Sequence, residues 1–182
     1  MKLKIRLIIM NFLQFGVWGA YLTCLGSYLF KAGLAEYIGI FFAMQGIVSL
    51  FMPAIVGIVA DRWIPAQKVL SICHGVAAVA MAAAGMYGLN AQPLEFGPLF
   101  ALCSVSVAFF MPTIALTNSV AYSALEGAGM DTVKEFPPIR VFGTIGFIVA
   151  MVLTSIFGFE EDARQLLFSA LLFTAQAGRV RA

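Results

Sequence analysis

A polar and aromatic face lies within the segment 136–147, which reads FPPIRVFGTIGF. Arg140, Thr144 and Phe147 are spaced i, i+4 and i+7, so in an α-helix they share one face. A guanidinium and a hydroxyl can hydrogen-bond a polar solute, and an aromatic ring can pack on a planar one. The two prolines suit a helix start, where a cation opposes the helix dipole. Arg140 therefore needs a polar cavity or an anionic partner, unless it extends to the lipid headgroups; spacing alone leaves both interpretations open.

A second polar stripe lies near the N-terminus, where amide and aromatic side chains recur at helical spacing as Asn11, Gln14, Trp18 and Tyr21. Amides inside a bilayer should face the interior of a helix bundle. A cavity lined in this way suits a planar, polar solute that can stack and hydrogen-bond. Gln14, Trp18 and Asn118 are therefore further candidate substrate-binding residues. The alternative is that the amides only join neighbouring helices through hydrogen bonds.

A third motif is GIVADR at 57–62, which is followed by Lys68. Gly57 would allow a close helix approach, and Asp61 could accept hydrogen bonds from the N-terminus of a neighbouring helix. Arg62 and Lys68 would hold the cytoplasmic face of the membrane. Such a gating loop can act as a latch between two helix bundles that rock against each other. The alternative is an ordinary membrane boundary with charged residues.

Other reactive side chains form no pattern of an enzyme, a metal site or a cofactor site. His74 is the only histidine, and a structural role for it competes with a role in a proton relay. Cys24, Cys73 and Cys103 lie in apolar runs without a CxxC pair, which argues against a metal site or a disulfide framework. Paired carboxylates, HExxH and nucleophile–base patterns are missing from the apolar segments, so we expect neither catalysis nor a cofactor. We also expect no nucleic-acid partner.

The composition shows what kind of element must position these residues. Of the 182 residues, 62% are hydrophobic and 11% are charged, and the mean hydropathy is +0.96. A soluble domain averages about 45–50% apolar and about 25% charged residues. A chain this small cannot hide so much apolar surface from water. The composition therefore predicts an all-α integral membrane protein surrounded by a lipid bilayer.

Charged residues divide the chain into apolar stretches that are long enough to cross about 30 Å of hydrocarbon as α-helices. The predicted spans are 7–30, 37–60, 69–89, 98–121 and 139–159. A sixth apolar run, 165–178, has 14 residues and would be only about 21 Å long. We therefore expect a shortened sixth helix. Because the chain stops soon afterwards at Ala182, we interpret it as a truncated protein or a fragment.

Basic residues are divided unevenly between alternate ends of these spans. The N-terminal tail, the loops 61–68 and 122–138, and the C-terminal tail together hold eight Lys and Arg residues, whereas the other loops hold Lys31 and Arg164. Basic residues collect on the cytoplasmic side of a membrane. The division predicts a multi-pass protein with a cytoplasmic N-terminus.

Several short segments of the chain resemble those of a known transporter family. The loop 57–62 resembles the GxxxD(R/K) loop of the major facilitator superfamily. Further segments are NFLQFGVWG (11–19), LGSY (25–28), FMPA (51–54), AGMD (128–131), FPPIR (136–140) and GTIGF (143–147). Together they closely resemble the nucleoside:proton symporters, a bacterial inner-membrane branch of that superfamily, up to about residue 172.

This resemblance implies that residues 1–182 form the N-terminal six-helix bundle of a major-facilitator fold, with a shortened sixth helix and an absent C-terminal half. It implies proton-coupled nucleoside uptake across the bacterial inner membrane by alternating access, with the nucleoside, protons and the missing half as partners. Arg140, Thr144 and Phe147 match substrate-binding positions of the family, where the Phe would pack on the nucleoside. Two alternatives remain, a membrane fragment that does not transport and a major facilitator transporter of another small solute.

Overall fold

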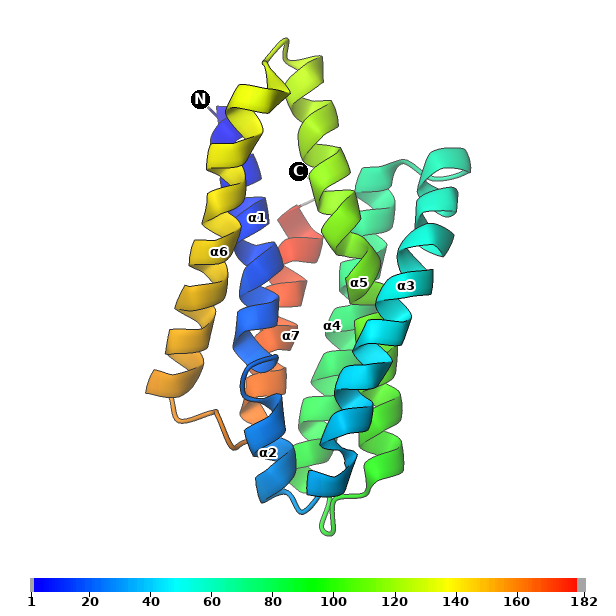
Figure 1. Ribbon diagram of the computed structural model, residues 1–182, viewed down its shortest axis with the longest axis vertical. Coiled ribbons are helices and arrows are strands. Elements are labelled where there is room, and N and C mark those ends of the chain that lie inside the picture. The colour runs from blue at the N-terminus through cyan, green and yellow to red at the C-terminus, as the bar shows by residue number, and fades with distance from the viewer. Residues whose placement is uncertain (1, 180–182) are drawn as a thin grey trace.

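The computed structural model describes residues 2–179, and nearly all of this range is helical. The elements in chain order are α1 (Lys2–Tyr21), α2 (Leu25–Lys31), the 3-10 turn η1 (Ala35–Tyr37), α3 (Ile38–Arg62), α4 (Ala66–Asn90), α5 (Phe96–Gly127), α6 (Thr132–Ile156) and α7 (Arg164–Arg179). The long helices run up and down beside one another as one bundle (Figure 1). The prediction of an all-α membrane fold is confirmed.

Five helical stretches are long and apolar enough to cross a membrane. They are Lys2–Lys31, Ala35–Arg62, Ala66–Asn90, Phe96–Gly127 and Thr132–Ile156. The first combines α1 and α2, which a short turn at 22–24 separates. α7 has 16 residues and is therefore about 24 Å long, less than the roughly 30 Å of the hydrocarbon core. Five long helices and a shortened last helix were predicted and are observed.

α6 begins earlier than the sequence predicted. We expected its start at about residue 139, behind the two prolines, but the helix begins at Thr132. The side chain of Asp131 caps it, because its Oδ1 accepts a hydrogen bond from the backbone N–H of Val133 at 3.0 Å. Each proline removes one backbone hydrogen bond, but the carbonyls that lose it belong to Val133 and Lys134 in the exposed first turn of α6, where water can replace it. Arg140 therefore lies more than two turns inside the helix, and its predicted place near the helix start is wrong.

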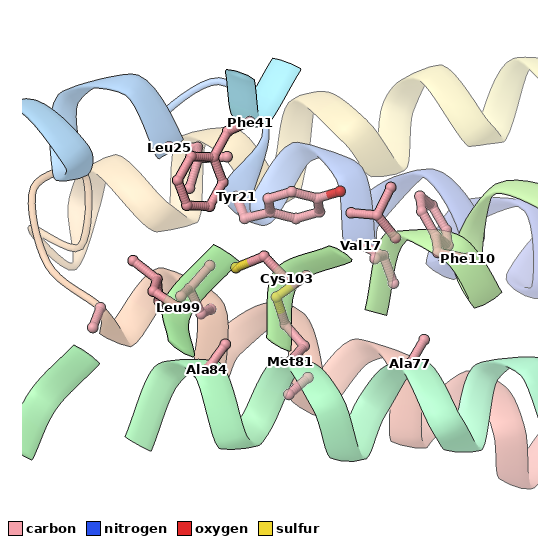
Figure 2. Packing of buried hydrophobic residues seen from close by; sticks show 14 of the residues in the cluster. Val17, Tyr21, Leu25, Phe41, Ala77, Met81, Ala84, Leu99, Cys103 and Phe110 are labelled. Atoms are coloured by element: carbon pink, nitrogen blue, oxygen red, sulfur yellow. The ribbon is translucent and has the colours of Figure 1, made fainter. Parts of the chain in front are cut away.

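α1 is the central element of the bundle. It packs against α6 on one side and against α7 and α5 on others, while α4 joins α5 and α7 (Figure 1). Figure 2 shows Val17 and Tyr21 of α1 beside Cys103 and Phe110 of α5, within a buried apolar cluster. α3 packs mainly on α5 and leaves most of its surface exposed. The bundle thus has its core around α1 and a loosely covered side at α3.

α1 and α6 approach most closely at two glycines. A Cβ added to Gly19 would collide with the backbone carbonyl of Phe147, and one added to Gly146 would collide with that of Phe12. A backbone carbonyl cannot swing aside as the tip of a side chain can, so only glycine fits at these two places. This glycine contact sets the height and rotation of α6 against α1. It thereby positions the polar face that α6 carries.

Candidate functional site

Arg140 and Thr144 lie one turn apart on the exposed face of α6. Together with Phe136, Pro137 and Val141 they line an open hollow of about 490 Å³. Arg140 is half-buried, and Thr144 is exposed. Ligand pockets typically measure about 300–1,000 Å³, so the hollow has room for a small solute. The structure therefore brings two of the three predicted α6 residues into one place.

Phe147, the third predicted residue of this face, lies further along α6 and is half-buried. Its backbone carbonyl packs against Gly19 of α1. Phe147 is not among the residues that line the hollow of Arg140 and Thr144. Phe147 is therefore not part of the wall of that hollow, and contact with a substrate stays a prediction.

The guanidinium of Arg140 rests on an aromatic ring of α1. Its Cζ lies 3.8 Å from the centroid of the Phe15 ring, which is the geometry of a cation–π contact. Phe15 is only 8% exposed, and its ring also meets that of Trp18 at a centroid distance of 6.4 Å. The contact joins α1 to the candidate site on α6.

No carboxylate in the described part of the chain pairs with Arg140. The ion pairs found there are Lys4–Glu135, Lys31–Glu161, Lys134–Asp131 and Arg164–Asp162, and all of them lie near helix ends. Within the same range, no group of three or more His, Cys, Asp or Glu residues could hold a metal. Arg140 is therefore a cation inside a membrane helix whose protein contact is an aromatic ring.

Gln14 is fully buried and joins three helices through its carboxamide. Its Nε2 donates to Thr113 Oγ1 at 2.8 Å, and its Oε1 accepts from Thr117 Oγ1 at 3.0 Å. The Thr113 hydroxyl donates to the carbonyl of Phe110 at 2.6 Å, so it must accept from Gln14, which settles the orientation of the amide. His74 Nε2 lies 2.9 Å from the same Oε1 and therefore carries a proton. These contacts agree with the interpretation that Gln14 joins helices.

His74 is enclosed by the bundle. It is fully buried on α4, between the rings of Phe110 and Phe173 at centroid distances of 6.5 and 5.8 Å. Its Nδ1 has no hydrogen-bond partner among residues 2–179. A proton relay needs hydrogen-bonded groups on both sides of the ring, so these surroundings favour the structural role.

Trp18 and Asn118 lie away from the hollow of Arg140 and Thr144. Trp18 lines a second hollow of about 400 Å³, bounded by α1, α3 and α5. Its other lining residues are Leu22, Phe42, Gln45, Gly46, Ser49 and Met111. Asn118 is half-buried on α5, and its Oδ1 finds no hydrogen-bond partner within the described range. A role in substrate binding stays a prediction for both residues.

The predicted gating loop lies at the end of α3. A Cβ added to Gly57 would meet nothing within 4 Å, so no close helix contact exists at this glycine. Asp61 and Arg62 are exposed, and no hydrogen bond from a neighbouring helix to Asp61 is found among the described residues. Residues 57–62 thus form the last turns of α3, where Val59 and Ala60 pack on a buried cluster of the bundle while the two charged side chains are exposed. The role of this segment as a gate stays a prediction.

Comparison with known proteins identifies the family. The family model described as "Nucleoside H+ symporter" matches residues 1–177. The chain belongs to this family. The nucleoside permease NupG of Escherichia coli (strain K12) is 43% identical over 174 residues, which cover 94% of this chain and 40% of that protein. The xanthosine permease of the same organism is 40% identical over 182 residues, covering 97% of this chain and 42% of that one.

A solved structure supports the same family assignment. A crystal structure of the nucleoside transporter NupG matches the chain with a TM-score of 0.87 at 40% identity, covering 100% of this chain and 44% of that chain. The major-facilitator-type fold and the multi-pass membrane character are therefore shown. The chain spans about two fifths of the length of the curated relatives it matches. Its named relatives are transporters rather than enzymes.

Three residues that contact the candidate side chains were not predicted from the sequence: Phe15 beside Arg140, and Thr113 and Thr117 beside Gln14. Phe15 carries no polar atom, so nothing in its own chemistry marked it as the neighbour of a cation. Thr113 and Thr117 form an i, i+4 hydroxyl pair inside an apolar run, directly after Pro112. That spacing was a usable signal for a polar face on α5.

Proposed function

We propose that this chain is the N-terminal half of a proton-coupled nucleoside transporter, which takes up nucleosides across the bacterial inner membrane by alternating access. The observation that carries the proposal is the family match over residues 1–177. The named activities of NupG and of the xanthosine permease support nucleosides as the substrate class. A C-terminal half, a nucleoside and protons are the partners that this function requires.

The hollow on α6 is the proposed nucleoside contact of this half. Arg140 and Thr144 would hydrogen-bond the nucleoside, because a guanidinium supplies five N–H donors and a hydroxyl both donates and accepts. Phe147 would pack on the flat base. Trp18 and Asn118 remain further candidates, and Gln14 is left out because the buried bundle already uses its carboxamide.

The proposed orientation places the N-terminus in the cytoplasm. The N-terminal end, the α3–α4 turn and the α5–α6 turn lie at the same end of the bundle (Figure 1). That end carries Lys2, Lys4, Arg6, Arg62, Lys68 and Lys134. The opposite end carries Lys31 and Arg164, and the excess of basic residues supports a cytoplasmic side. The loop of Gly57, Asp61 and Arg62 would then gate the cytoplasmic opening against the other half.

Uptake of radiolabelled uridine tests the proposal in a bacterium that lacks nucleoside transporters. The chain is expressed alone and joined to the C-terminal half of NupG of Escherichia coli. We expect uptake by the joined protein, its loss with a protonophore, and no uptake by the chain alone. A joined protein that inserts into the membrane and transports no nucleoside would contradict the proposal and leave a non-transporting fragment or a carrier of another solute. Uptake by the chain alone would contradict the need for a second half.

A further inference from the structure

The protein contact of the Arg140 guanidinium is an aromatic ring rather than an acidic side chain of the described residues. The guanidinium lies over Phe15 with Cζ 3.8 Å from the ring centroid. No ion pair with a carboxylate is found for it within residues 2–179. An acid would neutralise the charge and occupy two N–H donors in a bidentate pair. A ring face attracts the cation without accepting conventional hydrogen bonds from those donors.

The stack requires a glycine at its edge. A Cβ added to Gly143 would lie 2.7 Å from Cδ2 of Phe15 and 2.8 Å from Nη1 of Arg140. Both the ring and the guanidinium therefore occupy the space that a side chain at this position would need. Because Phe15 is nearly buried and also meets Trp18, its ring cannot easily turn away. The contact is built by both helices together.

We propose that Phe15 is the positioning residue of Arg140, and that its ring holds the guanidinium in the hollow with the N–H donors free for the nucleoside. A long Arg side chain loses rotamer freedom when it binds a ligand. A guanidinium that is already held loses less, so binding is tighter. The inference rests on the proposed function, because it assumes that Arg140 contacts the nucleoside.

Fluorinated phenylalanines test the inference, since ring fluorine weakens the negative face of the ring with little change in shape. The joined protein carries phenylalanine, 4-fluorophenylalanine or 3,4,5-trifluorophenylalanine at position 15, and uridine affinity is measured in detergent. We expect the dissociation constant to rise stepwise, in total about 3- to 30-fold for the trifluoro ring. The same series at Phe41 is the control, because this buried ring contacts only Phe96 and Phe100 among the aromatic and cationic groups described. Its affinity for uridine should not change.

Two substitutions of Phe15 by standard amino acids complete the test. Phe15→Tyr should keep the affinity close to that of the parent, and Phe15→Leu should weaken it by an amount similar to the trifluoro ring. If Arg140→Gln weakens binding while the fluorinated series at position 15 leaves it unchanged, Phe15 is only a packing residue and the inference is overturned. If Arg140→Gln leaves uridine binding unchanged, the site assignment under the proposed function fails, and this inference fails with it.

Discussion

Two neighbouring residues of α1 face different helices: Gln14 contacts α4 and α5, and Phe15 contacts α6. The polar groups on these two sides of α1 differ in whether their hydrogen-bonding atoms are paired within the bundle. On the Gln14 side a carboxamide is buried and pairs with Thr113, Thr117 and His74. On the Phe15 side a cation rests on a ring beside an open hollow. Polar groups that satisfy one another inside a bundle hold helices together, whereas those left with spare donors in a hollow can bind a ligand.

Two threonines show the same difference. Thr117 is fully buried, and its hydroxyl donates to Gln14. Thr144 is exposed in the hollow beside Arg140. Residue type does not separate them, because both sit in apolar helical runs. We therefore expect substitutions on the Gln14 side to lower stability and those in the hollow to lower nucleoside affinity.

The largest effect is expected from Gly146→Ala, which tests the glycine contact behind the hollow. The added Cβ would collide with the backbone carbonyl of Phe12, so α1 and α6 would have to separate. We expect a loss of about 3 kcal/mol in the free energy of unfolding, measured as a lower midpoint of thermal unfolding in detergent. Gly39→Ala in α3 is the control, since its Cβ would meet nothing within 4 Å. Equal midpoints for the two variants would show that the helices do not pack this closely.

Arg140→Gln should act on affinity. Removing a charged donor should weaken uridine binding by the joined protein by about 2 kcal/mol, or roughly 30-fold. The thermal midpoint should change little, because Arg140 is half-exposed and has no acidic partner in the described part of the chain. Isothermal calorimetry and thermal unfolding on the same preparation separate the two effects. A large fall in the midpoint with unchanged affinity would make Arg140 a structural residue.

Gln14→Leu should lower the stability of the protein and leave its nucleoside affinity unchanged, the opposite of Arg140→Gln. Thr117 and His74 would each lose a partner while they stay buried, so we expect about 1.5 kcal/mol less stability. The uridine affinity of the folded protein should stay the same. Gln67→Leu at the exposed start of α4 is the control and should leave the midpoint unchanged. If Gln14→Leu weakens uridine binding and leaves the midpoint of thermal unfolding unchanged, Gln14 is a substrate-binding residue.

The smallest effects are expected from a pair of threonine-to-valine changes that remove one hydroxyl at nearly constant volume. Thr144→Val should weaken uridine binding by about 1 kcal/mol, and Thr117→Val should lower stability by a similar amount. Each should leave the other quantity unchanged. If both variants lose the same quantity, the distinction between the two sides of α1 is not valid.

The helices of this chain were largely predictable because their formation is a local matter. A long apolar run in a bilayer must be helical to satisfy its own backbone hydrogen bonds. The start of α6 was not predicted, because the proline pair was taken as the helix start, although Asp131 provides the cap further upstream. The pairing of Arg140 with Thr144 was predictable, since i, i+4 spacing places two residues on one face whatever surrounds the helix.

The tertiary structure decided what each face meets. Gln14 and Arg140 both looked like candidates for binding, but only packing shows that one lies among α4 and α5 and the other beside a hollow. Phe15 could not be recognised from its sequence context, because its partner lies on α6, far along the chain. Composition and helix geometry by themselves determine that this chain forms membrane helices and which residues share a face. Which helix each face meets depends on long-range contacts such as that of Gly19 with Phe147, and no local pattern contains that information.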